Sequence, residues 1–241
     1  MKENKEDNNN NNVEVKKTGI KKIKIVVIGD HATGKTSFID KICSDIFNVN
    51  VESTISNKLN YKKYNNDNDS YMFEFNDLGG QDYNIVINKI ILKSITAIIY
   101  CCSPELKDSL ENILKWNKAC LDTIESTENV PKFIVINKCD LDQKFEEKDI
   151  EEVKNKIAKK YYYVSAKDGV FKNEDSKTLR VNEFLDDLLD NIDNLENIKE
   201  VLSESDVDLG LDLERKHSES EYSQNNKQKE EDDKSKKGCC Y

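Results

Sequence analysis

The chain alternates short apolar runs with longer segments in which apolar residues recur every three or four positions. Short runs of this kind are typical of strands that are covered on both faces, and the longer period is typical of helices. Strands that alternate with helices predict an α/β fold with a mostly parallel, six-stranded sheet and helices on both faces. We expect strands at 23–28, 59–64, 71–76, 97–102, 133–136 and 161–164, and helices at 36–43, 105–125, 147–159 and 181–195.

The last of these helices has the clearest pattern. Its apolar residues lie on one face when drawn at helical spacing: Val181, Phe184, Leu185, Leu188, Leu189, Ile192 and Leu195. Earlier in the chain, the polar segment 65–70 predicts a hairpin turn between two strands. Because ligands of such sheets bind outside the carboxyl ends of the strands, the residues that follow each strand are candidates for a site.

Two polar segments flank the patterned region. Residues 1–19 contain an asparagine run at 8–12 and are typical of a disordered leader, while residues 197–241 are acidic and serine-rich and predict a flexible tail. Polar segments of this kind bury too little surface to offset the entropy of ordering. We therefore expect one domain at 20–196.

Charge and cysteine placement restrict the class of protein. The formal net charge of −10 argues against nucleic acid as a partner, because phosphate backbones select basic surfaces. Five of the 7 cysteines fall in or beside the expected strands and helices, where free cysteine packs as a small apolar residue. We find no secretory signal and no apolar run of about 18 residues. We therefore expect a reduced, intracellular protein that does not span a bilayer.

A glycine-rich loop follows the first expected strand and precedes the first expected helix. Its pattern is that of a phosphate-binding loop, in which backbone N–H groups and a helix N-terminus face the phosphates. Lys35 would reach the β- and γ-phosphates, and the Thr36 hydroxyl would bind Mg²⁺. A plain glycine turn is the alternative. The predicted nucleotide-binding residues here are Gly29, Asp30, His31, Ala32, Thr33, Gly34, Lys35, Thr36 and Ser37.

A second candidate segment follows the strand at 71–76. Asp77 would support Mg²⁺, the Gly80 N–H would contact the γ-phosphate, and Gln81 is placed to orient the attacking water. Taken alone, an aspartate three residues before a glycine is a common turn. Its order after the phosphate loop makes it part of a proposed catalytic set.

Two further segments follow later strands and predict the base that is bound. Asn137, Lys138 and Asp140 come after the strand at 133–136, and Ser165, Ala166 and Lys167 come after the next one. A carboxylate at Asp140 would accept hydrogen bonds from guanine N1–H and the exocyclic amine. A site built to bond such donors rejects analogues that lack them, so guanine is expected rather than adenine.

With these segments in this order, the chain resembles the Ras superfamily of small GTPases, which share a P-loop small G domain, and is similar to its Rab branch. The resemblance covers about residues 20–195. The segment 109–116, which ends at Trp116, is also similar to Rab sequences. It implies that Thr54 binds Mg²⁺ and the γ-phosphate and that Phe47 packs on guanine. It also implies an exchange factor, a GTPase-activating protein, effectors and a GDP-dissociation inhibitor as partners, and a role in vesicle trafficking. Trp116 itself we interpret as a packing residue.

The chain departs from the family pattern at several positions. His31 stands where Ras proteins have glycine, and its side chain would obstruct an arginine finger or point into solvent. The three effector-facing aromatics of Rab proteins correspond to Leu59, Asn76 and Ile91. Neither of the two arginines, Arg180 and Arg215, is placed to reach the γ-phosphate, and an arginine finger contributes about 10³–10⁵ in turnover. We therefore expect slow hydrolysis that needs an activating protein.

The chain ends in a cysteine pair, Cys239 and Cys240, followed by Tyr241. This ending is no C-a-a-X box, and it resembles the Rab signal for double prenylation; two exposed free thiols are the alternative. Two lipid chains suffice for stable anchoring. We expect a lipid-anchored protein on the cytosolic face of an internal or plasma membrane, with a cytosolic pool.

Three functions are compatible with these features. The first is a GTPase switch that uses GTP, GDP and Mg²⁺, with Gln81, Lys35, Thr54 and Gly80 in the catalytic set. The second is a membrane-tethered module that binds nucleotide with little or no hydrolysis, although retention of Gln81 and Thr54 argues against it. An ATP-using P-loop kinase is disfavoured by Asp140 and by the missing lid.

Overall fold

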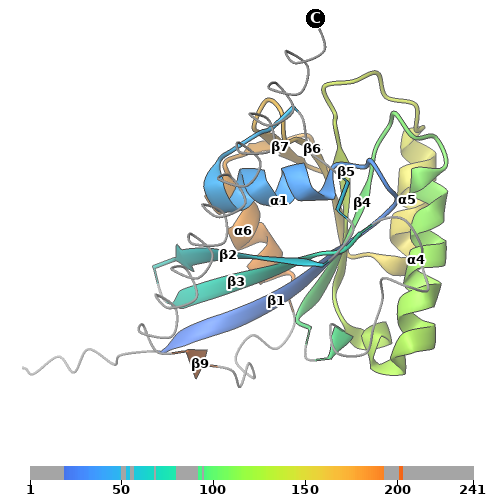
Figure 1. Cartoon of the computed structure of the whole chain (residues 1–241). Helices are drawn as coiled ribbons and strands as arrows, with labels where there is room; N and C mark the ends of the chain where they lie inside the picture. Colours follow the sequence, from blue (N-terminus) through green and yellow to red (C-terminus); the bar gives the residue numbers. More distant parts are fainter. Residues whose placement is uncertain are drawn as a thin grey trace, which may run out of the picture.

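The computed structural model describes residues 19–49, 53–54, 57–67, 69–79, 92–93, 95–192 and, for the backbone, 201–202. These residues form an α/β fold in which helices cover both faces of one sheet (Figure 1). In the described residues, no helix combines the length and apolar character needed to cross a membrane. Cys43, Cys101, Cys102, Cys120 and Cys139 are free thiols.

The central strands carry the longest apolar runs. They are β1 (Ile20–Ile28), β3 (Ser70–Asp77), β4 (Ala97–Cys102), β5 (Lys132–Asn137) and β6 (Lys160–Ser165), and every neighbouring pair among them is parallel. The strand order is β2-β3-β1-β4-β5-β6-β7-β8, so the chain winds outward from β1 in both directions. The predicted hairpin is present, because β2 (Lys58–Asn65) pairs antiparallel with β3.

The sheet has nine strands in the described residues, whereas six are expected from the sequence. The three additional strands are β7 (Val170–Asn173), β8 (Thr178–Leu179) and β9 (Val201–Leu202). β7 and β8 continue the sheet beyond β6, and β9 pairs antiparallel with β1 at Ile20 and Lys21. Strands of two to four residues are too short to give a periodic pattern, which explains the difference.

Among the described residues, two helices cover each face of the sheet. Helices α1 (Lys35–Ser44) and α6 (Val181–Asp190) lie on one face, and α4 (Ser109–Thr123) and α5 (Glu147–Ile157) on the other (Figure 1). A 3-10 turn, η1 (Glu125–Asn129), links α4 to β5. Helix α6 ends at Asp190, earlier than expected; Ile192 is still buried, and Leu195 lies outside the described residues.

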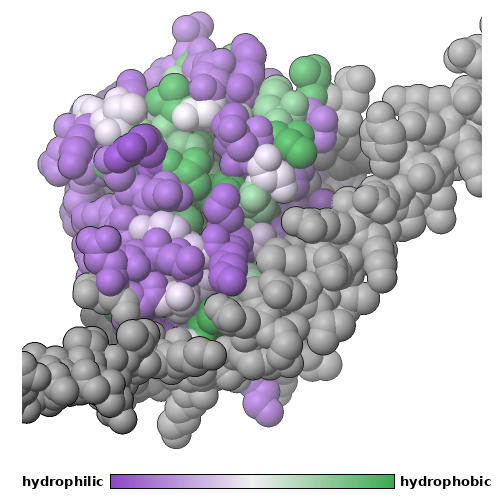
Figure 2. Space-filling view, turned by 90° about the vertical axis from the view of Figure 1, so that its left-hand side faces the viewer, coloured by the Kyte–Doolittle hydropathy of each residue, from purple (hydrophilic) through white to green (hydrophobic). Residues whose placement is uncertain are grey.

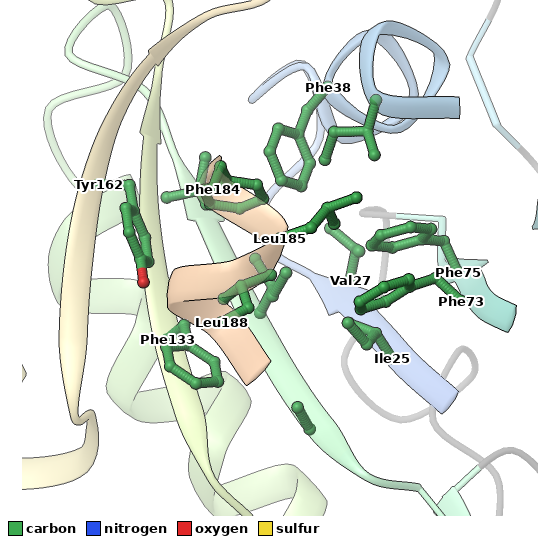
Figure 3. Close-up of a cluster of buried hydrophobic side chains, with 14 of the residues drawn as sticks. Ile25, Val27, Phe38, Phe73, Phe75, Phe133, Tyr162, Phe184, Leu185 and Leu188 are labelled. Carbon is green, nitrogen blue, oxygen red and sulfur yellow. The ribbon is translucent and has the colours of Figure 1, made fainter. Parts of the chain in front are cut away.

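Alternation along β1 divides the core into two layers. Ile23, Ile25 and Val27 pack toward α1 and α6, while Val26 and Ile28 pack toward α4 and α5. On the first side, aromatic rings from β3, α1 and α6 gather around the strands, and Phe184 meets Tyr162 edge to face with 4.9 Å between the ring centroids (Figure 3). This packing holds the carboxyl ends of the strands in place, and the candidate site is built there.

Candidate functional site: a phosphate-binding loop and a base pocket

Four loops meet at the carboxyl edge of the sheet, after β1, β3, β5 and β6. Because these strands run parallel in the central part of the sheet, with β4 between β1 and β5, segments more than 100 residues apart in sequence meet at one edge. Next to them is a cavity of about 340 Å³. It is lined by His31, Ala32, Gly34, Lys35, Thr36, Ser37, Phe47, Asn48, Val49, Ser53, Thr54, Asn137, Lys138, Asp140, Ala166 and Lys167.

The loop after β1 needs its glycines because other backbone and side-chain atoms press against them. A Cβ placed on Gly29 would lie 2.0 Å from the backbone oxygen of Cys101. Gly34 has a φ of +85°, and a Cβ there would lie 2.4 Å from Asn137 Nδ2. Ala32 also adopts a left-handed conformation, with a φ of 63°, which costs an L-residue about 1–2 kcal/mol. The loop is therefore held in a strained, close-packed shape.

Lys35 is the buried cation of this loop. Its side chain is 6% exposed, and Nζ donates hydrogen bonds of 2.9 Å to the carbonyl oxygens of Gly29 and Asp30. Burial lowers the pKa of Lys35, although the charges of Cys101, Asp77 and Asp30 oppose this. A lysine whose charged form is disfavoured by burial gains from an incoming anion, so the site favours a phosphate group.

An oxygen cluster lies beside Lys35. Thr36 Oγ1 donates to Asp77 Oδ2 at 2.6 Å and lies 2.8 Å from Thr54 Oγ1. Asp77 is fully buried, and its other oxygen, Oδ1, has no hydrogen-bond partner among the described residues. Burial raises the pKa of Asp77, although the Thr36 hydrogen bond and the Lys35 charge act against it. Hydroxyl and carboxylate oxygens suit a hard cation, and an orphaned carboxylate oxygen would gain from one, so these residues fit Mg²⁺.

The side chain of Asn137 joins the phosphate loop to the loop after β6. Its Nδ2 donates to the carbonyl oxygens of Thr33 at 3.1 Å and Gly34 at 3.0 Å. Its Oδ1 accepts a hydrogen bond of 3.3 Å from the Ala166 N–H. Asn137 is only 1% exposed, so these bonds are shielded from water. Its contacts are thus those of a connector between two loops.

Asp140 lines the cavity. Its carboxylate is held by two residues of the loop after β6. Ser165 Oγ donates to Asp140 Oδ1 at 2.8 Å, and Lys167 Nζ lies 3.6 Å from Oδ2. Lys138 pairs with Glu105 at 2.6 Å in front of the phosphate loop. The carboxylate is therefore oriented before any ligand arrives, which lowers the cost of binding.

The structure brings most of the sequence-predicted residues to this cavity. Five of the described ones do not line it: Gly29, Asp30, Thr33, Asp77 and Ser165 lie behind the lining residues and bond to them or to the core. Gly80, Gln81, Cys239 and Cys240 lie outside the described residues, as does Ile91. The lining residues not anticipated from the sequence are Asn48, Val49 and Ser53. They lie between Phe47 and Thr54, which were both predicted to contact the nucleotide, and this position in the sequence could have indicated them.

The departures from the family pattern have definite positions. His31 is exposed on the cavity lining, so its ring is accessible to a partner. Leu59 is 45% exposed, whereas Asn76 is 8% exposed and donates weak hydrogen bonds to Ile25 O and Glu74 Oε1. Trp116 is 1% exposed, in agreement with its interpretation as a packing residue.

Comparison with known proteins gives the family. The Ras family model matches residues 24–180, which is more than half of the chain. Ras-related protein Rab-31 of Rattus norvegicus is 28% identical over 142 residues, which cover 59% of this chain and 69% of the relative. Ras-related protein Rab-34 of Mus musculus is 28% identical over 155 residues, covering 63% and 60%. RabN1 of Dictyostelium discoideum is 28% identical over 122 residues, covering 48% and 56%. This protein therefore belongs to the Ras family, as a divergent, Rab-like small GTPase.

Proposed function

We propose that this protein binds GDP and GTP with Mg²⁺, hydrolyses GTP slowly, and acts as a membrane-anchored switch in vesicle trafficking. One observation supports the proposal above all others. Along a single edge of the sheet, the cavity joins a buried lysine, the Thr36 and Thr54 hydroxyls with the buried Asp77 carboxylate behind them, and a pre-oriented aspartate. Those three parts match the phosphates, the metal ion and the base of a guanine nucleotide.

In this proposal, each end of the nucleotide has its own partners. Lys35, held by the loop carbonyls, reaches the phosphates, and the phosphate charge restores the ammonium form that burial disfavours. At the other end, Asp140 accepts the two donor groups of guanine, with Ser165 and Lys167 holding the carboxylate in position. Phe47 lines the cavity and packs on the base.

Thr36, Thr54 and Asp77 would hold the metal ion, which when bound supplies positive charge to offset that of the phosphates. Gln81 orients the water that attacks the γ-phosphate, and the Gly80 N–H contacts that phosphate. His31, exposed on the cavity lining, occupies the approach to the phosphate loop and slows hydrolysis further. A partner protein then supplies the missing arginine in trans.

A single-turnover assay tests the catalytic part. Purified protein loaded with GTP and Mg²⁺ is followed for phosphate release, with Gln81→Leu as the variant and Gln143→Leu, an exposed glutamine outside the cavity lining, as the control. Slow release that falls further only in Gln81→Leu supports the switch. Tight GTP binding without release in any form would instead support the tethered binding module.

A competition assay tests the base. The native chain should bind GTP and not ATP, and Asp140→Ala should lose about 10–100-fold in GTP affinity, the range for a hydrogen bond to a charged group. Equal binding of ATP and GTP by the native chain would contradict the guanine assignment.

The anchor needs a separate measurement. The mass of the protein from its own cells should exceed that of the chain by two prenyl groups, and the added mass should be lost in the Cys239→Ser, Cys240→Ser double variant. Native protein of unmodified mass in the membrane fraction would refute lipid anchoring through these cysteines.

A further inference from the structure

Asp30 connects the phosphate loop to helix α4. Its Oδ1 accepts a hydrogen bond of 2.8 Å from Trp116 Nε1, and its Oδ2 accepts one of 2.7 Å from Asn112 Nδ2. Asn112 and Trp116 are four residues apart on α4, so both donors come from one helix face. Bonds from such donors to a carboxylate are stronger than neutral ones.

The backbone carbonyl of Asp30 accepts hydrogen bonds from two side chains of the phosphate loop. The Asp30 carbonyl oxygen accepts hydrogen bonds of 2.9 Å from Lys35 Nζ and from Thr33 Oγ1. The Thr33 N–H also points to it, at 3.4 Å. A shift of Asp30 would therefore move Lys35 and Thr33 together, because all three share one set of contacts.

Helix α4 offers a rigid support for this contact. Trp116 is 1% exposed and packs in the core layer with Leu110, Ile113 and Cys120 of the same helix. Its indole ring is therefore fixed by packing, and Asp30 is held against a group that moves little. The contact spans 86 residues of sequence and joins the loop after β1 to an element that does not line the cavity.

We propose that Asp30 is a positioning residue which, through Trp116 and Asn112, holds the phosphate loop in the shape that a nucleoside diphosphate or triphosphate requires. This inference rests on the proposed function, because it assigns a role within the same nucleotide site. The base is held by other loops, at Asp140 and Lys167. Loss of the contact should therefore weaken binding of GDP, which has a β-phosphate, more than binding of GMP, which has none.

Calorimetric titration of nucleotide-free protein with GDP and with GMP tests the proposal. Asp30→Ala, Trp116→Phe and Asn112→Ala should each weaken GDP binding by about tenfold, the scale of one hydrogen bond to a charged group, and GMP binding by less. Asp30→Asn keeps an acceptor for Trp116 and should recover most of the loss. Because the pair acts as a unit, the double variant Asp30→Ala, Trp116→Phe should be little worse than either single one.

The matched control is Tyr100→Phe. It removes a hydrogen bond of 3.0 Å from Tyr100 to Asn117 Oδ1, which ties the same helix to β4 without touching the phosphate loop. This control should leave the ratio of GDP to GMP affinity unchanged. An equal loss for GDP and GMP in the Asp30 and Trp116 variants, or strictly additive losses in the double variant, would overturn the proposal.

Intrinsic fluorescence provides a second readout that needs no nucleotide. Trp116 is the single tryptophan of the chain, so all tryptophan emission comes from the indole that bonds to Asp30. Asp30→Asn removes a negative charge beside the indole N–H and should shift the emission maximum, whereas Asp40→Asn should not. An unchanged maximum in Asp30→Asn would contradict the contact. If the native chain bound no guanine nucleotide, both the proposed function and this inference would fail. If the native chain bound GDP and the variants bound it equally well, this inference alone would be overturned.

Discussion

Replacing Asp77 with asparagine should stabilise the empty protein while weakening its response to Mg²⁺. Asp77 is fully buried at the end of β3, with one oxygen bonded to Thr36 and the other without a hydrogen-bond partner in the part of the chain that the structure describes. Burial disfavours its charged form and raises its pKa. Asparagine has the same shape and no charge, so Asp77→Asn removes a cost that the folded, ligand-free chain bears.

The size of the effect follows from the contacts. Leaving a buried polar group unsatisfied costs about 1–3 kcal/mol, and more when it is charged; asparagine keeps a polar atom there and removes only the charge-dependent part of this cost. Against this, the variant loses the attraction between Asp77 and Lys35, which favours the charged form. We expect a net gain of about 1 kcal/mol in the free energy of unfolding near pH 7. For a domain of this size that corresponds to a rise of about 2–4 °C in Tm.

The sign of the pH dependence is also determined. Because the pKa of Asp77 is raised, the folded state holds this proton more tightly than the unfolded state does. The stability that this provides is complete below the ordinary value of 3.8 and is lost as the pH rises through the raised pKa. The advantage of Asp77→Asn over the native chain should therefore grow as the pH rises across this window, and it should vanish near pH 4.

Thermal unfolding with EDTA and with Mg²⁺ and GDP provides the assay. Ligand that binds only the folded state raises Tm, and this rise should be smaller in Asp77→Asn. Asp40→Asn is the matched control, because burial also raises the pKa of Asp40, whose carboxylate pairs with Lys58 at 3.8 Å, whereas the Thr36 hydroxyl donates to Asp77. It should leave the Mg²⁺ response intact. A lower Tm for Asp77→Asn in EDTA at pH 7 would refute the reasoning.

Four other substitutions test backbone strain and the construction of the site by urea unfolding. Ala32→Gly should stabilise the empty protein by about 1 kcal/mol, since glycine adopts a left-handed conformation without strain. Ser176, outside the cavity, also has a left-handed conformation, so Ser176→Gly should give a similar gain. No gain in either variant would contradict the strain. Asn137→Ala should cost about 2–3 kcal/mol, because it removes three shielded hydrogen bonds, and a loss below 1 kcal/mol would indicate that water replaces them. Gly29→Ala should yield little folded protein, since its Cβ would lie 2.0 Å from the Cys101 oxygen; normal stability would mean that the loop can move.

The elements with strong apolar patterns were predictable from the sequence. β4 runs from Ala97 to Cys102, as predicted, because all six of its side chains are apolar and buried and the apolar run ends at the polar Ser103. Once the parallel order was inferred, the meeting of the loops after β1, β3, β5 and β6 followed, since carboxyl ends of parallel strands share an edge. The cavity lies at this edge because the strands are parallel, and the alternation of apolar runs with helical patterns predicts a parallel sheet.

What could not be predicted depends on side-chain contacts between distant segments. Nothing around Trp116 indicates that its indole nitrogen meets Asp30, because the helical pattern identifies a buried face and not its polar partner. Asn137 was expected to recognise the ligand, and its three bonds within the protein depend on the exact spacing of two loops. The β7–β8 hairpin was missed because Phe171 is nearly alone among polar residues, although it packs against Phe38 and Phe184.

The two ends of the strand order affect how the molecule behaves when it is crowded. At one end, β2 carries Lys58, Lys62 and Lys63, and the side of the molecule seen in Figure 2 is mainly hydrophilic over its described surface. At the other end, β8 is only two residues long. Lysine-rich and very short edge strands discourage sheet-to-sheet pairing between copies. Molecules gathered at high local density would thus resist aggregation through these edges and stay separate, each able to meet its own partners.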